Sequence, residues 1–227
     1  MANNTNNVIV GAAEIAIGTW GAGTTLSAAT NVDAIFTALK TAVSTGKDYR
    51  TYVNDATTTK TLTVGSQTLT FNDVGLTQQG VEVQYKPDYG EVEVDQLLDA
   101  ARLFKQKMSV NVTTTFAEAT LENLVVVWDD AVDPVGTTEK SIYVKPGNLG
   151  DVPNERVLLF VGGAPGGTST ITSAKQRVYL ASRAVSMEAS NHALRRNEAT
   201  VFPVSFRLLP DTTSSYSAYG KIVDITG

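Results

Sequence analysis

The sequence predicts a mainly β protein of the antiparallel α+β class. Predicted strands outnumber predicted helices, and several of them alternate apolar and polar residues with a period of two. Turns connect these strands in place of the regular crossover helices that a parallel sheet requires. The 227 residues suffice for one large domain or two small ones, and no change in composition marks a linker.

The first seventy residues predict two short strands, a helix and a hairpin. Residues 8–10 and 14–18 are rich in β-branched side chains and predict strand. Residues 31–45 place apolar side chains on one helical face, with Asn31 or Thr30 as the N-cap and Gly46 after the end. Residues 61–71 alternate around Gly65-Ser66 and predict a hairpin.

The middle of the chain predicts a second hairpin, with strands at 81–85 and 91–95 and a turn at 86–90 that contains proline and glycine. One face of this hairpin is apolar and the other is acidic or amide-bearing. Residues 96–107 have a short apolar stripe that predicts a helix, and residues 109–114 alternate as a strand.

A further helix is predicted from Thr115, because Thr115 and Glu118 have the spacing of a capping box. Its apolar stripe is expected to pack on a sheet, and Asp129, Asp130 and Pro134 are expected to end it. The packing residues are Leu121, Leu124, Val125 and Trp128. The C-terminal third then predicts strands at 155–161, 176–187, 200–209 and 221–225, with a glycine-rich break at 162–167.

Composition excludes several classes of function. Lys and Arg total 18 against 23 Asp and Glu, so the chain lacks the positive charge expected of a nucleic-acid binder. With no cysteine and one histidine, it has no thiol nucleophile and no site made of two imidazoles. No assembled acid, base and nucleophile is recognisable, so we expect neither an enzyme nor a bound cofactor or metal.

The N-terminal residues lack a basic segment followed by an apolar one, and no apolar run reaches the roughly 18 residues of a membrane span. We therefore expect synthesis in a cytoplasm and no membrane partner.

Three motifs have ordinary interpretations beside their chemical ones. The glycine-rich 162–168 segment lacks the lysine and following helix of a phosphate loop, so a hairpin tip is favoured. His192 lies in a polar stretch without a nucleophile nearby, which favours an exposed loop histidine over a catalytic base. Asp129, Asp130 and Asp133 lack the spacing of a calcium-binding loop, so a solvated helix end is favoured.

The acidic alternation at Glu91, Glu93 and Asp95 is less ordinary, because like charges about 7 Å apart on one strand face repel one another. Any solvent-facing strand can carry charges. An acidic sheet face would also suit a surface past which a polyanion moves without binding.

Four segments resemble the major tail tube proteins of tailed bacteriophages. They are residues 73–81, the strand at 90–96, residues 117–124, and the stretch from 193–200 to 206–211. The resemblance covers residues 8–18, 73–130 and 176–227. It rests on the spacing and the general character of the residues, because none of the motifs is catalytic. Residues 19–72 exceed the short linker expected in that family, so the helix at 31–45 and the hairpin at 61–71 are interpreted as an insertion in one tube domain spanning 1–227.

The resemblance implies two packed antiparallel sheets, a sandwich or half-barrel with a flanking helix, which join six to a ring and close into a continuous barrel. Stacked rings form a tube in the virion tail, assembled in the host cytoplasm, through which DNA is ejected. The implied partners are copies of the chain, tape measure, tail terminator and baseplate proteins, and a sheath protein if the tail contracts. A lumen lined by basic residues would hold DNA, so we expect an acidic and amide lining. The residues predicted to face the lumen are Glu82, Gln84, Glu91, Glu93 and Asp95.

Two other functions remain open from sequence. A monomeric β-sandwich with aromatic residues on its loops, among them Trp20 and Tyr216, would bind carbohydrate or decorate a virion. A tube-initiating or baseplate-proximal tail protein of the same fold would form rings without long tubes. Electron microscopy of the purified protein separates all three.

Overall fold

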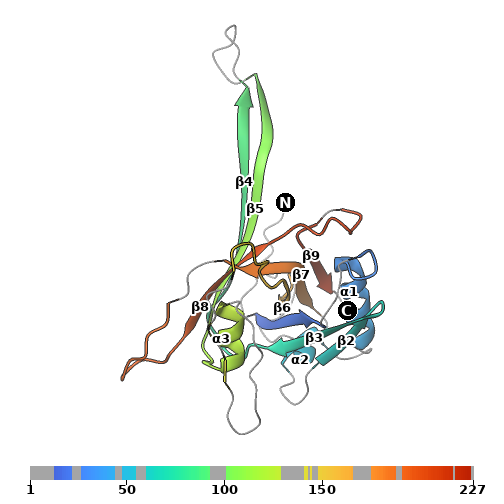
Figure 1. Cartoon of the computed structure of the whole chain (residues 1–227). Coiled ribbons are helices and arrows are strands. Elements are labelled where there is room, and N and C mark those ends of the chain that lie inside the picture. Colours follow the sequence, from blue (N-terminus) through green and yellow to red (C-terminus); the bar gives the residue numbers. More distant parts are fainter. Residues whose placement is uncertain are drawn as a thin grey trace.

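The structure is a computed structural model that describes residues 13–21, 27–43, 48–54, 60–92, 101–128, 141–142, 144, 148–165, 175–187, 191–216 and 218–225. It is a mainly β protein of the α+β class (Figure 1). The elements are β1 Glu14–Trp20, α1 Val32–Ala42, α2 Tyr49–Val53, β2 Lys60–Val64, β3 Gln67–Asp73, β4 Thr77–Val92, β5 Arg102–Phe116, α3 Leu121–Trp128, β6 Arg156–Gly163, β7 Gln176–Ser186, β8 Phe202–Leu208 and β9 Lys221–Ile225.

The nine strands form one antiparallel sheet in the order β2-β3-β1-β6-β7-β8-β5-β4, with β9 also paired to β7. The antiparallel class is therefore confirmed, but the strands form a single hydrogen-bonded sheet and not two. The reason lies in β7, which pairs with β9 through its first half and with β8 through Ala184–Ser186. Because β7 belongs to both halves, no break separates them.

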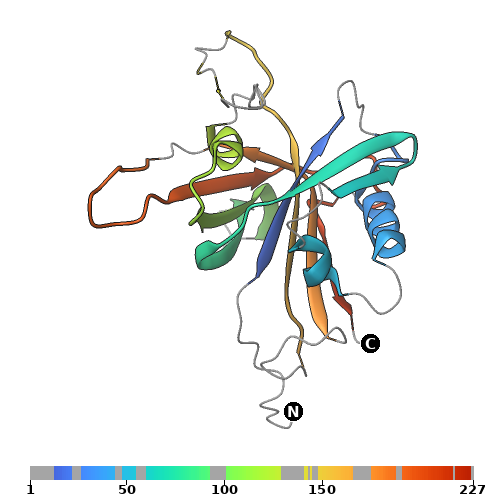
Figure 2. The ribbon, with the colours of Figure 1, turned by 90° about the horizontal axis from the view of Figure 1, so that it is seen from below.

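The sheet curls so that β8 and β5 run across β1 and β6 (Figure 2). One hydrophobic cluster lies inside this curl and joins residues of β5 and β8, such as Phe116 and Phe206, to Ile15, Phe160 and α3. A second cluster lies on the other face, where α1, α2, β2 and β3 pack. β6 has residues in both clusters and is buried on both faces along most of its length, so it forms the centre of the fold.

The N-terminal predictions are largely confirmed. Asn31 caps α1 by accepting the backbone N–H of Ala34 at 2.9 Å, and the hairpin turns at Gly65, where φ is +61°. The short helix α2, capped by Asp48, was not predicted. The predicted strand at 8–10 lies outside the described residues.

The predicted turn at 86–90 is wrong, because β4 runs without interruption from Thr77 to Val92. Tyr85 and Pro87 pair with Val110 and Met108 of β5. Proline is tolerated here because β4 is an edge strand, where a missing N–H breaks no central ladder. The predicted helix at 96–107 is also wrong over 102–107, which form β5, while 96–100 lie outside the described residues.

The start predicted for the next helix is wrong as well. β5 continues through Phe116 and α3 begins at Leu121. Thr120 is the cap, since its Oγ1 accepts the backbone N–H of Asn123 at 3.2 Å. Glu118 instead accepts the N–H of Leu76 at 2.9 Å. The four C-terminal strands are confirmed as β6, β7, β8 and β9.

Candidate assembly surface

The most prominent surface feature is a two-stranded ribbon, the arm, made of residues 86–92 of β4 and 102–109 of β5. It rises clear of the body in Figure 1. β8 pairs with β5 only from Val110 to Phe116, so a third strand supports the base of the hairpin and none of the described strands supports the arm. Among the described strands, each strand of the arm is therefore paired only with the other. A two-stranded hairpin alone is at best marginally stable in water.

One face of the β4–β5 hairpin continues the hydrophobic core into solvent. Val110 and Val112 lie in the first cluster, where Val81 packs against them. Further along the same face Tyr85 is 59% and Leu103 61% exposed. Lys105 also lies on this face, since its ammonium is 5.6 Å from the centre of the Tyr85 ring. The exposed apolar residues on this face are Val83, Tyr85, Tyr89 and Leu103.

The opposite face is polar next to the body, and it carries two exposed apolar residues, Val92 and Phe104, at the far end of the described arm. The register aligns Glu82 with Thr113 and Ser205, and Gln84 with Asn111 and Arg207, in two rows across β4, β5 and β8. Directly paired residues point to the same side of a sheet. These rows therefore form a surface of amides, hydroxyls and a few charges.

The five residues predicted to face a lumen are not all on this polar face. Glu82 and Gln84 lie on it and are exposed. β4 has no inserted residue between Val81 and Val92, because the irregularity beside Asp88 leaves Gln106 of β5 as the extra residue. Strict alternation along β4 therefore places Glu91 on the Tyr85 face. Glu93 and Asp95 lie outside the described residues.

The described polar face is also not strongly acidic. Lys86 and Asp88 follow Gln84 on the same side of β4, and Asp88 pairs across the strands with Lys107. Together with Glu82 and Arg207, these residues bring both signs of charge to the face. The face thus combines mixed charges with neutral hydrogen-bonding groups.

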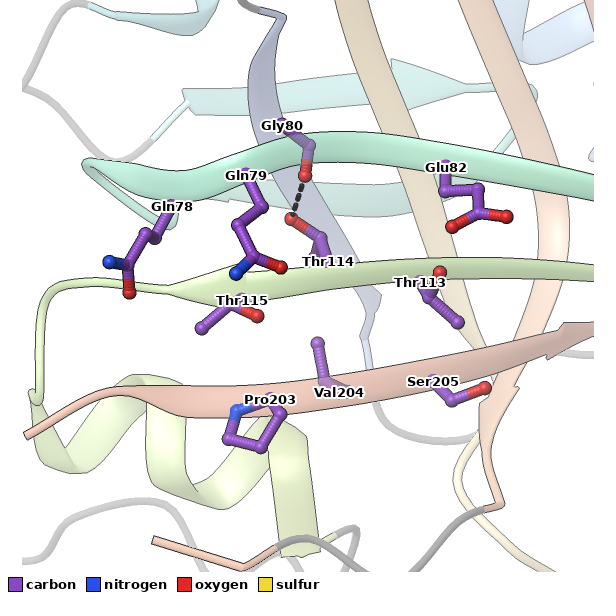
Figure 3. Close-up of a pocket in the computed structure, with 10 residues that line it drawn as sticks. All are labelled: Gln78, Gln79, Gly80, Glu82, Thr113, Thr114, Thr115, Pro203, Val204 and Ser205. Carbon is purple, nitrogen blue, oxygen red and sulfur yellow. Dashed lines mark hydrogen bonds between the residues drawn. The ribbon is translucent and has the colours of Figure 1, made fainter. Parts of the chain in front are cut away.

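A polar pocket of about 230 Å³ lies at the base of the hairpin (Figure 3). It forms where β4 bulges, because Gln79 and Gly80 both have positive φ and interrupt the pairing between Gln78 and Val81. The Thr114 hydroxyl donates to the Gly80 carbonyl at 2.8 Å and fixes the bulge. The pocket has one carboxylate, Glu82, and no aromatic side chain among its lining residues, so it has no aromatic surface on which a sugar ring could stack.

A larger groove of about 470 Å³ lies between α2, the end of β3 and the start of α3. Its buried lining residues are Ala16, Val53 and Phe71, and its exposed ones include Leu76, Glu118 and Glu122. Asp73 also lines the groove, and burial raises the pKa of its carboxyl, with the charges of Glu14 and Glu118 adding to that rise. No sequence pattern predicted this groove, since its residues come from five separate segments.

The α3 residues that were predicted to pack on the sheet divide into two kinds. Val125 is buried and Leu124 packs partly against the first cluster, while Leu121 is partly buried. Trp128 is 40% exposed and contacts the His192 ring, with 5.8 Å between ring centres. His192 also meets Phe202 edge-on at 5.0 Å, so it has a packing role that its sequence context did not indicate.

Metal-binding clusters are absent from the described part of the chain. Its His, Asp and Glu residues form no group of three placed to hold a metal ion. Asp129, Asp130 and Asp133 lie outside the described residues, as do residues 166–168 of the glycine-rich segment. Among the helices that are described, none is long and apolar enough to cross a membrane.

No family model matches the chain, and no curated protein matches it.

Proposed function

We propose that this chain is a structural protein that polymerises with copies of itself, and that the assembly is a phage tail tube of stacked hexameric rings. The observation that carries the proposal is the arm, whose apolar face continues the core beyond the body. Exposed tyrosine and leucine on an unsupported two-stranded ribbon are typical of a surface that is buried in an assembly. A second copy is the partner we propose for it.

The open sheet supports the same proposal. Among the described strands, the terminal ones, β2 and β4, do not pair with each other, so one edge of each faces no other described strand. Open edges promote aggregation in a monomer, whereas a ring of subunits can join them into a continuous barrel. In the proposed ring, β4 of one copy meets the sheet of the next.

The tube would act as a conduit without a chemical step. In the proposed arrangement the polar face of β4, β5 and β8 lines the lumen, and the apolar face of the arm packs on a neighbouring copy. DNA binds surfaces that release its counterions, which requires an excess of Lys and Arg. The mixed charges and neutral groups around Glu82, Asn111 and Arg207 provide little net attraction, so DNA would slide past them.

The proposal also includes the partners that a tail tube requires: tape measure, terminator and baseplate proteins, with a sheath protein if the tail contracts. These rest on the family resemblance alone. A tube-initiating protein of the same fold would use the arm in the same way but form only single rings.

The test is negative-stain electron microscopy together with sedimentation velocity of the purified chain. We expect rings and filaments from the wild type, and loss of both from the double variant Tyr85→Ser, Leu103→Ser. Tyr216→Ser is the matched control, because Tyr216 is 86% exposed and is not one of the residues that form the arm. A wild-type protein that stays monomeric at all concentrations would contradict the proposal and favour a binding module, and single rings would favour a tube-initiating protein.

A further inference from the structure

The loop between β7 and β8 projects from the body, as Figures 1 and 2 both show for residues 191–201. Leu194 near its tip is 86% exposed. The adjacent Arg195 pairs with Glu198 across the turn at 2.8 Å, and Arg196 is exposed beside it. At the base of the loop His192 packs between Trp128 and Phe202. The loop thus presents one leucine and one guanidinium from an anchored base.

The groove beside α2 is complementary to this loop, because it combines apolar surface with carboxylates. Buried Ala16, Val53 and Phe71 provide apolar surface within it, and its volume of about 470 Å³ is in the range of pockets that enclose small ligands. Four carboxylates line it, from Glu14, Asp73, Glu118 and Glu122, against the single ammonium of Lys60 among its lining residues. An apolar side chain accompanied by a cation fits this combination.

The electrostatics of Asp73 favour an arriving cation. The hydrogen bond from the N–H of Gly75 at 2.9 Å and the charge of Lys60 lower the pKa of this carboxyl, yet burial, with Glu14 and Glu118, raises it overall. Glu14 is already engaged by Arg50 at 2.5 Å. A guanidinium near Asp73 would offset part of the free-energy cost of the charged form of this carboxyl.

We propose that the Leu194–Arg196 tip of one copy seats in this groove of a second copy, with Leu194 on the apolar surface and Arg196 beside the carboxylates. The loop and the groove are different surfaces of one chain, so the contact is heterologous and either closes a ring or propagates a filament. The inference rests on the proposed function, because it specifies one contact within that assembly.

A charge exchange tests the contact. Arg196→Glu and Glu122→Arg, each alone, place like charges together, and we expect each to weaken self-association at least about tenfold in sedimentation velocity. The double variant restores opposite charges and should recover most of the wild-type association. Lys40→Glu is the matched control, since Lys40 is an exposed cation on α1 outside the groove and the loop. Circular dichroism checks that every variant is folded.

The outcomes separate this inference from the proposed function. If the wild type forms rings and filaments and both single variants assemble equally well, the loop–groove contact is refuted and the proposed function stands. Single variants that fail while the double variant remains as weak as they are also refute the contact. A wild type that stays monomeric overturns both.

Discussion

Asp211 holds the N-terminus of α1 against the end of β8, since its buried carboxylate accepts the backbone N–H of Val32 at 3.2 Å. The same carboxylate accepts the Ser182 hydroxyl and both the N–H and the hydroxyl of Thr213. Val32 is the first residue of α1, and its N–H is one of the donors that a helix cannot satisfy internally. One side chain therefore connects the 19–72 region, β7 and the C-terminal loop.

Replacing Asp211 should destabilise the fold strongly. Asp211→Ala leaves the Val32 N–H and the Ser182 hydroxyl in a buried site without this acceptor. Hydrogen bonds to charged groups contribute roughly 1.5–3 kcal/mol each, so we expect a loss of about 3 kcal/mol in the free energy of unfolding, measured in urea. Asp151→Ala, in an exposed turn, is the control and should lose less than about 1 kcal/mol. Equal losses would show that Asp211 is not a central connection.

Gly75 and Gly80 allow the stability cost of backbone strain to be separated from the cost of a steric clash. Both have φ near +75°, but a Cβ at Gly75 would lie 2.1 Å from the Glu118 carboxyl carbon, while a Cβ at Gly80 would meet nothing within 4 Å. Gly80→Ala should cost about 1–2 kcal/mol from conformation alone. Gly75→Ala should cost more, because Glu118 must also leave its bond to Leu76. Adding Glu118→Ala to Gly75→Ala should reduce the difference in stability between the two glycine variants. Thermal unfolding of the three variants measures this difference.

The Arg177–Asp224 ion pair predicts a small stability change with a defined pH range. Its Nε–Oδ1 distance is 2.6 Å, and the hydrogen bond from Arg177 lowers the pKa of Asp224. A lowered folded-state pKa means that the stabilisation is present above the unfolded pKa, about 3.9, and is lost as the pH falls through the folded value. Both side chains are partly exposed, so Asp224→Asn should cost no more than about 1 kcal/mol at pH 7. Urea unfolding at pH 7 and at pH 2.5 tests this, and a cost that persists undiminished at the lower pH would contradict it.

Local signals in the sequence predicted the elements that depend on local contacts. Asn31 before α1 and Gly65 in the β2–β3 hairpin each act on residues only a few positions away, and the predictions based on them are confirmed. The wrong predictions concern residues whose structure depends on contacts with distant segments. Pro87 and Gly90 have the residue types of a turn, yet pairing with β5 keeps them extended.

The capping pattern at Thr115 and Glu118 failed for the same reason, because β8 holds Thr115 in a strand and Leu76 takes the Glu118 carboxylate. The candidate site was less predictable than the fold. The alternation of residues correctly placed Glu82 and Gln84 on the opposite face of the strand from Val81. The face on which Glu91 lies, however, depended on whether the chain turned at 86–90. The groove required Glu14, Asp73 and Glu118 to meet from three segments, which no spacing along the chain encodes.

Asp73 provides the last prediction, since it carries a charge that its surroundings do not fully stabilise. Burial raises the pKa of its carboxyl above the ordinary value, so the folded state binds a proton more readily than the unfolded chain does. The stability that Asp73 contributes is therefore present below its unfolded pKa and is lost as the pH rises through the folded one.

Asp73→Asn keeps an oxygen to accept the Gly75 N–H and removes the charge. We expect the variant to be as stable as the wild type at pH 7 or more stable by up to about 1 kcal/mol, with that gain disappearing near pH 3. Urea unfolding at both values measures this, and Asp88→Asn on the exposed arm is the control. A clear loss of stability at pH 7 would mean that the carboxylate charge is needed in the groove.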